Sequence, residues 1–336
     1  MSYQCLTTLQ GARDAVISLS FSPQAKFIAA AGYGGIAIWD LETFDVIPVS
    51  SNVYNPRNPR NVCTASAWIH FEQNDRHVLL VGSQEGTLSM LQWTDNHKAF
   101  STVIQVIPES PGSQVLSIDV YQEEISIGRL ARIVVATADT RVTVYSLSSS
   151  CELKEIYSVL LNDFNLIAAK FCKRTADIYA FEFDGGGVLR LDDKTGTLKS
   201  NQKYGPDPMG TVCTDDSSTF FVAFTGQDFQ MLRLENLEYV KCFSGPDPVI
   251  RFPKVAAFAE DGIALVGGTD SGYAVVFNIT SGNEVQRLSY PKGGLVQPVA
   301  ACTSKDGYMI AIAGSAMETP ADVLIYGKQH SSTSTK

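Results

Sequence analysis

The chain has 336 residues, a formal net charge of −9, and a composition that is 45% hydrophobic and 18% charged. Such values are typical of a globular protein, and the acidic balance argues against binding to the phosphate backbone of nucleic acids as the main task. The first residues show no basic stretch followed by an apolar core, and no apolar run reaches the roughly 18 residues that cross a bilayer. We therefore expect a cytoplasmic protein, with the nucleus as the alternative, and neither nucleic acid nor membrane as a partner.

The seven cysteines are widely spaced and stand mostly inside apolar runs, and no Cys-x-x-Cys pair occurs. None of the four histidines flanks a cysteine. This pattern predicts free, buried thiols in a reducing compartment, with no disulfide, no metal site and no cofactor.

Residues 15–47 contain four short apolar runs, each bounded by turn residues. A strand over 16–21 is followed by the turn at Ser22 and Pro23, a strand over 27–31, a glycine turn and a strand over 36–39. Asp40 closes that third strand, and a fourth begins near Phe44. The pattern predicts a four-stranded antiparallel meander, which cannot bury both of its faces alone and so requires copies of itself.

Six further groups of apolar runs follow in chain order. The predicted strands are 63–71, 77–82, 87–93 and 100–107; then 115–121, 131–137, 142–147 and 153–159; then 167–172, 178–183, 188–191 and 198–203. The remaining ones are 209–214, 219–225, 229–234 and 239–243; then 255–259, 263–268, 273–278 and 284–288; and finally 296–303, 308–314 and 323–326. A large third-strand residue recurs at intervals of about 40 to 55 residues, the spacing of four-stranded propeller blades. These residues are Trp39, Trp93, Tyr145, Leu191, Leu232, Phe277 and Ile325.

The seventh group is one strand short, and the short alternating run at 4–9 can supply the missing strand. We therefore predict an all-β fold, a seven-bladed β-propeller of four-stranded antiparallel blades closed by the N-terminal strand. Residues 1–327 are expected to form this single domain, with 2–10 as the closing segment of the last blade. The final segment, 328–336, is expected to be a disordered tail.

Residues 5–40, CLTTLQGARDAVISLSFSPQAKFIAAAGYGGIAIWD, resemble a WD40 repeat. The shared features are an outer strand that ends in Leu and Gly, the Phe-Ser-Pro turn, a glycine-rich hairpin and the final Ile-Trp-Asp. The chain departs from the family pattern where Gly11 is followed by Ala12 and not by histidine, and the Trp-Asp ending appears only once. The hydrogen-bond network known for the family therefore cannot be carried over, and we expect packing to stabilise the blades instead.

Motifs that carry catalysis are absent from the sequence: there is no phosphate-binding loop, no His-Glu-x-x-His and no Gly-x-Ser-x-Gly. The glycine run at 184–187 is interpreted as a hairpin turn, and the carboxylate pairs at 192–193 and 215–216 as turn residues. We therefore predict that the chain is not an enzyme. A propeller hydrolase or lactonase and a small-ligand or sugar-binding propeller remain the alternatives, against which the scarcity of histidine, the lack of repeated inward carboxylates and the divergence of the repeats count.

Proline-rich segments join the predicted blades, and proline stiffens a loop by lowering the entropy lost on fixing it. In a propeller these loops share one face with the turns between second and third strands. We expect this face to bind a protein or peptide, so that the chain is a non-catalytic interaction scaffold, monomeric alone or a subunit of a larger complex. The residues assigned to this binding face are Arg13, Tyr33, Arg57, Arg60, Glu85, Asp139, Tyr204, Asp207, Gln227, Arg251, Phe252 and Tyr290.

Overall fold

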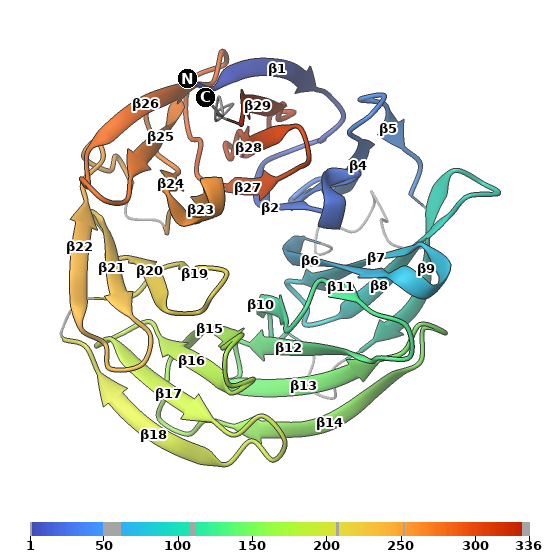
Figure 1. The fold of residues 1–336 in the computed structure, drawn as a ribbon, viewed down its shortest axis with the longest axis vertical. Helices are drawn as coiled ribbons and strands as arrows, with labels where there is room; N and C mark the ends of the chain where they lie inside the picture. Colours follow the sequence, from blue (N-terminus) through green and yellow to red (C-terminus); the bar gives the residue numbers. More distant parts are fainter. Residues whose placement is uncertain (1, 50–61, 108–111, 206–207, 251–252, 331–336) are drawn as a thin grey trace, which may run out of the picture.

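The computed structural model describes residues 2–49, 62–107, 112–205, 208–250 and 253–330. Seven antiparallel sheets are arranged in a ring around a central channel (Figure 1). Each sheet contains a blade of four antiparallel strands, the first of which lies innermost, and one sheet has a fifth strand. The predicted seven-bladed β-propeller is therefore confirmed. No helix in the described part of the chain is long and apolar enough to span a membrane.

The strands follow the predicted order closely. Blade 1 contains β2 (Val16–Phe21), β3 (Phe27–Gly32), β4 (Gly35–Asp40) and β5 (Val46–Ile47), and blade 2 contains β6 (Cys63–Phe71), β7 (Arg76–Ser83), β8 (Leu88–Thr94) and β9 (Ala99–Val106). Blade 3 contains β10 (Val115–Val120), β12 (Ala131–Thr137), β13 (Arg141–Leu147) and β14 (Leu153–Leu160), and blade 4 contains β15 (Leu166–Phe171), β16 (Ile178–Glu182), β17 (Gly187–Leu191) and β18 (Leu198–Lys203). Blade 5 contains β19 (Val212–Thr214), β20 (Phe220–Phe224), β21 (Phe229–Arg233) and β22 (Tyr239–Phe243), and blade 6 contains β23 (Ala256–Ala259), β24 (Ala264–Gly267), β25 (Tyr273–Asn278) and β26 (Glu284–Ser289).

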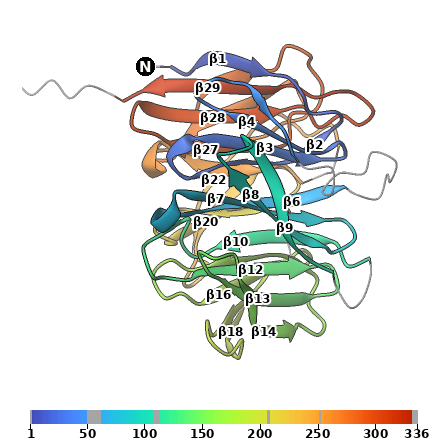
Figure 2. The same ribbon diagram turned by 90° about the vertical axis from the view of Figure 1, so that its right-hand side faces the viewer.

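Blade 7 combines the two ends of the chain. It contains β27 (Val299–Thr303), β28 (Gly307–Ala313), β29 (Val323–Gln329) and β1 (Gln4–Leu9). Strand β1 pairs antiparallel with β29 (Figures 1 and 2), which confirms the predicted closure of the ring. Strand β29 continues to Gln329, two residues past the predicted domain end at 327. The tail, predicted to begin at 328, therefore begins after the strand ends at Gln329.

Three short 3-10 turns and one extra strand complete the described elements. The turns η1 (Pro23–Ala25), η2 (Glu72–Asn74) and η3 (Glu260–Gly262) connect the first and second strands of blades 1, 2 and 6. The extra strand, β11 (Glu124–Ile125), leaves blade 3 and pairs in parallel with the end of β6 in blade 2. It links two blades through backbone hydrogen bonds as well as through packing.

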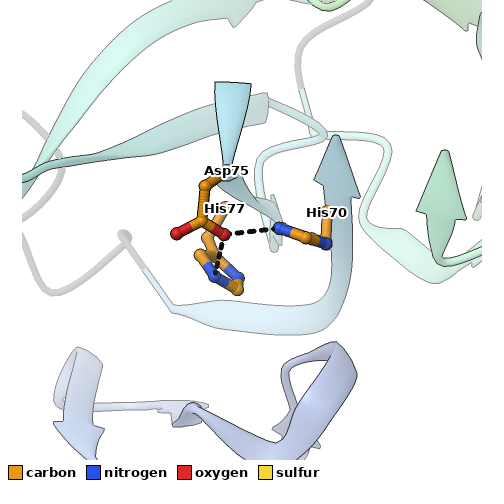
Figure 3. Close-up of side chains that lie close together, drawn as sticks. All are labelled: His70, Asp75 and His77. Carbon is orange, nitrogen blue, oxygen red and sulfur yellow. Dashed lines mark hydrogen bonds and ion pairs between the residues drawn. The ribbon is translucent and has the colours of Figure 1, made fainter. Parts of the chain in front are cut away.

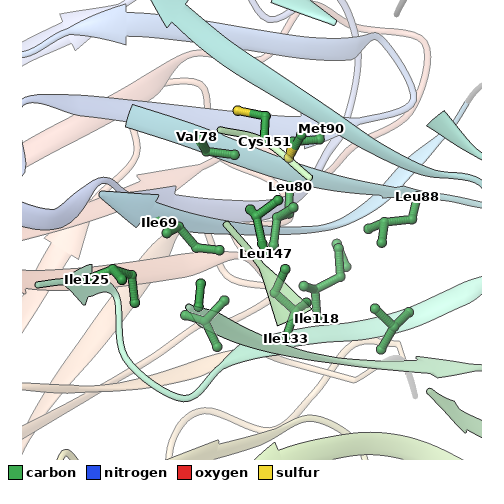
Figure 4. Packing of buried hydrophobic residues seen from close by; sticks show 14 of the residues in the cluster. Ile69, Val78, Leu80, Leu88, Met90, Ile118, Ile125, Ile133, Leu147 and Cys151 are labelled. Atoms are coloured by element: carbon green, nitrogen blue, oxygen red, sulfur yellow. The ribbon is translucent and has the colours of Figure 1, made fainter. Parts of the chain in front are cut away.

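The hydrophobic core is divided into seven clusters, and each cluster fills the space between two neighbouring blades. Figure 4 shows the cluster between blades 2 and 3, where Leu80 and Ile69 meet Ile118, Ile133 and Leu147. Because seven interfaces close the ring, each blade covers both of its faces with apolar side chains from its neighbours. The ring thus buries both faces of every meander, which a single meander cannot do alone.

Register shifts in strand pairing recur at equivalent points of several blades. They show which residues of different blades are equivalent and correct one of the predicted equivalences. The pairing of the first and second strands shifts register at the start of blades 1 to 4, beginning at Val16, Cys63, Val115 and Leu166. Counting from this shift, the residue of blade 2 that corresponds to Trp39 is Leu91 and not Trp93. Strand β6 has nine residues where β2, β10 and β15 have six, so the hairpin of blade 2 extends beyond the common blade.

Trp39 is fully buried, and its indole Nε1 donates a hydrogen bond of 3.0 Å to the carbonyl oxygen of Gln10. Gly11 packs beside the indole, because a Cβ at this position would lie 3.1 Å from Val46 and 3.7 Å from Trp39. Its φ of 131° also favours glycine. In blade 1 a backbone carbonyl therefore accepts the indole hydrogen bond.

Candidate binding face and central channel

The loops between blades and the turns between second and third strands lie on one side of the ring, which we call the loop face. Backbone hydrogen bonds join the two kinds of loop: Tyr33 donates to Ala15 at 3.0 Å, Gln84 to Val62 at 2.9 Å and Tyr204 to Gly186 at 2.9 Å. The expected gathering of these segments is therefore present. Loops whose backbones are hydrogen-bonded to each other lose little freedom when a partner docks.

Two of the assigned residues meet where blade 7 adjoins blade 1, a place we call the seam. Arg13 and Tyr33 are exposed there, and Gly34, next to Tyr33, lies so close to Arg13 that a Cβ would be 3.0 Å from the Cβ of Arg13. Asp14 accepts a hydrogen bond of 2.7 Å from the backbone N–H of Glu318, which brings the loop of blade 7 to the same place. Met317 in that loop is 57% exposed, and sequence reasoning missed it.

The other described residues of the predicted face lie apart from the seam. Glu85 and Asp139 are half-buried in the turns of blades 2 and 3, and Gln227 is exposed in the turn of blade 5. Tyr204 is half-buried, and its hydroxyl donates to Gln230. The remaining assigned residues, Arg57, Arg60, Asp207, Arg251 and Phe252, lie outside the described residues.

Tyr290 lies on the loop face but does not offer a surface to a partner. Its side chain is 5% exposed, and its hydroxyl oxygen accepts a hydrogen bond of 3.0 Å from the backbone N–H of Asp322. A Cβ at Gly314 would lie 2.6 Å from that hydroxyl, so the ring fills the space under the loop of blade 7. The assignment of Tyr290 as an exposed contact residue is therefore corrected: it holds a loop in place.

A buried ion pair anchors the loop face at blade 6. The ammonium of Lys254 lies 2.7 Å from Asp270 Oδ2, and the two side chains are 3% and 0% exposed. Asp270 also accepts hydrogen bonds from the backbone N–H of Ile250 and from Gln297 Nε2, at 3.0 and 2.9 Å. Burial alone would raise the pKa of Asp270, but these hydrogen bonds outweigh it and lower the pKa below its usual range. The carboxylate therefore stays charged and fixes the end of the inter-blade loop.

The central channel is a hollow with a volume of about 700 Å³. Its walls are the innermost strands, and its charged residues gather where the first-to-second-strand turns open on the face opposite the loop face. Carboxylates at this mouth come from blades 3, 5 and 6, and Lys170 is the basic residue in the wall. They are Glu123, Asp215, Asp216 and Asp261. These carboxylates line the channel mouth but do not occupy one repeated position of the blades, so they do not contradict the expected lack of repeated inward carboxylates.

Glu123 is solvent-exposed but lies inside the mouth of the channel, where surrounding protein raises the pKa of its carboxyl group. The ammonium of Lys173 opposes this rise, and the carboxylates of Asp119 and Asp216 add to it. Lys170 is held 3.3 Å from Asp119 Oδ1. The mouth therefore has a surplus of negative charge and would attract cationic groups.

Two groups of described side chains have the spacing of metal ligands. The first contains Asp177, Asp192 and Asp193, whose charges are already neutralised: Lys199 lies 2.7 Å from Asp177 and 2.8 Å from Asp192, and Arg132 lies 2.8 Å from Asp193. The carboxylate pair at 192–193 therefore belongs to an ion-pair network at a turn. The second group is His70, Asp75 and His77 in the hairpin of blade 2. A signal for it was available, since one histidine lies near each end of the predicted turn.

Comparison with known proteins leaves the chain without a family assignment. No protein-family model matches it, and no curated protein matches it.

Proposed function

We propose that the chain is a divergent WD40-type propeller and a non-catalytic scaffold that binds a protein or peptide on its loop face. The observation that carries the proposal is the seam, where exposed Tyr33 and Met317 stand on loops fixed by backbone hydrogen bonds. Tyrosine and methionine are enriched at the centres of interfaces, and a stiff support lowers the cost of ordering them. The scaffold acts in the cytoplasm, alone or as a subunit of a larger complex.

The WD40 resemblance rests on blade 1, which combines the Ser-Pro turn, the buried Trp39 and the neighbouring Asp40. The other six blades share its strand order, and three of them share the register shift between its first and second strands. Repeats that keep pairing geometry while their sequences diverge are compatible with one ancestral blade. Fold alone does not set function, so the binding role depends on the seam.

The proposal is tested by comparing two surface variants in affinity capture from cell extract, with the captured proteins quantified by mass spectrometry. The first variant carries Tyr33→Ser and Met317→Ser at the seam. The control carries Ile127→Ser and Leu130→Ser, two apolar residues of the opposite face that are more exposed than Tyr33 and Met317. We expect proteins captured by the parent to be lost at least about tenfold from the seam variant and kept by the control, as for interface hot spots. Loss from the control alone, or from neither variant, would contradict docking at the seam.

A further inference from the structure

The hairpin of blade 2 places two histidines directly opposite each other, on the face opposite the loop face. His70 at the end of β6 is the register partner of His77 at the start of β7. Opposite residues of an antiparallel pair point to the same side of the sheet with their Cβ atoms about 5 Å apart. Both residues belong to the part of the hairpin that extends beyond the common blade, so no other described blade has an equivalent pair.

Asp75 brings a carboxylate between the two imidazoles. It ends η2 in the left-handed conformation, with φ of 43°, which turns the chain back toward β7. Its Oδ1 lies 2.8 Å from His70 Nε2 and 3.7 Å from His77 Nε2, as Figure 3 shows. Zinc bound at about 2.0 Å by two imidazole nitrogens and a carboxylate would hold these atoms about 3.3 Å apart, a value between the two distances from Oδ1.

Three of the four ring nitrogens of His70 and His77 lack the hydrogen bonds that buried polar atoms normally have. His77 is 0% exposed and His70 is 4% exposed. No described atom hydrogen-bonds to either ring nitrogen of His77 or to Nδ1 of His70. A buried imidazole nitrogen without a hydrogen-bond partner can offer its lone pair to a metal ion.

The surroundings hold the rings in place and leave one side open. Phe27 packs edge-on against His77 at 5.1 Å, and the two imidazoles stack at 4.4 Å. Asp75, in contrast, is 71% exposed, so water and ions reach the carboxylate. Lys26 is 3.9 Å from the other oxygen, Oδ2, and does not occupy the histidine side. This differs from the Asp177 group, where ammonium and guanidinium groups already occupy the carboxylates at 2.7 to 2.8 Å.

We propose that His70, Asp75 and His77 bind a divalent transition-metal ion of the zinc type. The ligand atoms are Nε2 of each histidine and Oδ1 of Asp75, and water completes the coordination on the exposed side. Two imidazoles and one carboxylate suit zinc better than magnesium or calcium, which prefer oxygen ligands only. Bound metal would cross-link the two strands of the extended hairpin of blade 2. Because β11 of blade 3 pairs with this hairpin, the metal would also stabilise the junction of the two blades.

The test uses the full chain, untagged and freed of metal with a chelator. A reference variant carries Cys5→Ser, His97→Gln and His330→Gln, which removes an exposed thiol and the two histidines outside the site. Zinc is titrated by calorimetry, cobalt by visible absorption, and magnesium serves as the control ion. We expect one zinc per chain in the parent and in the reference variant, cobalt bands typical of nitrogen and oxygen ligands, and no response to magnesium.

Two substitutions in the reference background assign the ligands. His77→Gln should abolish saturable zinc binding, and Asp75→Asn should weaken it at least about tenfold, because a charged ligand is lost. Asp75 is exposed, so Asp75→Asn remains informative even if His77→Gln does not fold. Zinc should raise the melting temperature of the reference variant and leave that of Asp75→Asn nearly unchanged. The proposal is overturned if the reference variant shows no saturable zinc binding, or if Asp75→Asn binds zinc as tightly as it does.

Discussion

Tyr3 and Gln286 are joined by two hydrogen bonds although 283 residues separate them. The backbone N–H of Tyr3 donates to Gln286 Oε1, and Gln286 Nε2 donates to the carbonyl oxygen of Tyr3, both at 2.8 Å. Gln286 belongs to β26 of blade 6, whereas β1 pairs with β29 of blade 7. The N-terminal segment is therefore fastened to two blades and not only to the blade that it completes.

Deleting residues 1–10 should strongly destabilise the ring. The deletion uncovers the hydrogen-bonding edge of β29 and removes Tyr3 and Leu9, which are 3% and 2% exposed. Burial of two such side chains contributes several kcal/mol, so we expect the melting temperature to fall by roughly 10 °C or more. Circular dichroism melts measure it, and deletion of residues 331–336 is the control at the other end of the chain. If the N-terminal deletion leaves the melting temperature unchanged, pairing of β1 with β29 does not stabilise the fold.

Gln286→Ala isolates the second attachment without touching β1. The variant loses both hydrogen bonds and leaves the backbone groups of Tyr3 without this partner, a loss of about 1–3 kcal/mol. We expect the melting temperature to fall by a few degrees. Val285→Ala on the same strand is the control, because Val285 is 60% exposed and should change stability little. Equal melts for the two variants would show that the Tyr3 contact contributes nothing.

Cysteine reactivity should separate the closing strand from the core. Cys5 is exposed on β1, whereas Cys63 is buried, and burial raises the pKa of Cys63 from 9.0 to about 12. Because thiolate is the reactive form, the intrinsic reactivity of Cys63 should be about a thousandfold lower than that of an ordinary thiol near pH 8. Brief alkylation followed by peptide mass spectrometry should label Cys5 well before Cys63. Modification of Cys63 at the rate of Cys5 would contradict the burial of that strand.

The fold could be predicted because its turns are marked in the sequence. Proline or glycine stands in most of the segments between strands, and the apolar runs between these segments have the lengths of strands. The closing strand was also predictable, since the seventh group of apolar runs contains only three strands and a fourth is available at 4–9. The residue of blade 2 that is equivalent to Trp39 could not be predicted. Trp93 is larger than Leu91, and only the register of strand pairing identifies Leu91 as the equivalent.

The sites were harder to predict because they depend on contacts between distant segments. Arg13 and Tyr33 lie together at the seam as parts of adjacent loops, but Met317 joins them from the other end of the chain. Lysine and aspartate in loops usually face solvent, so Lys254 and Asp270 gave no sign of their burial. Period-2 patterns indicate which side chains share a face, yet they do not indicate which blades become neighbours.

The buried pair of Lys254 and Asp270 should be costly to break from one side. Asp270→Ala leaves the Lys254 ammonium buried without its carboxylate, and such losses cost about 3–5 kcal/mol. The double variant Lys254→Met, Asp270→Leu removes both charges and should regain most of that loss. Urea denaturation of the single variants Lys254→Met and Asp270→Leu and of the double variant gives the coupling between the residues. Additive losses would indicate that the two charges do not interact.

The same pair should make stability depend on pH in acid. The pKa of Asp270 is lowered in the folded protein, so folding favours the charged carboxylate. Its contribution is complete at pH values above the unfolded pKa of about 3.9 and is lost as the pH falls through the lower, folded pKa. Asp270→Asn cannot titrate, so its free energy of unfolding should fall less steeply between about pH 4 and pH 2 than that of the parent. Parallel pH profiles for parent and variant would mean that Asp270 is not a source of acid sensitivity, and the Lys254 contact would then stabilise the loop face only through geometry.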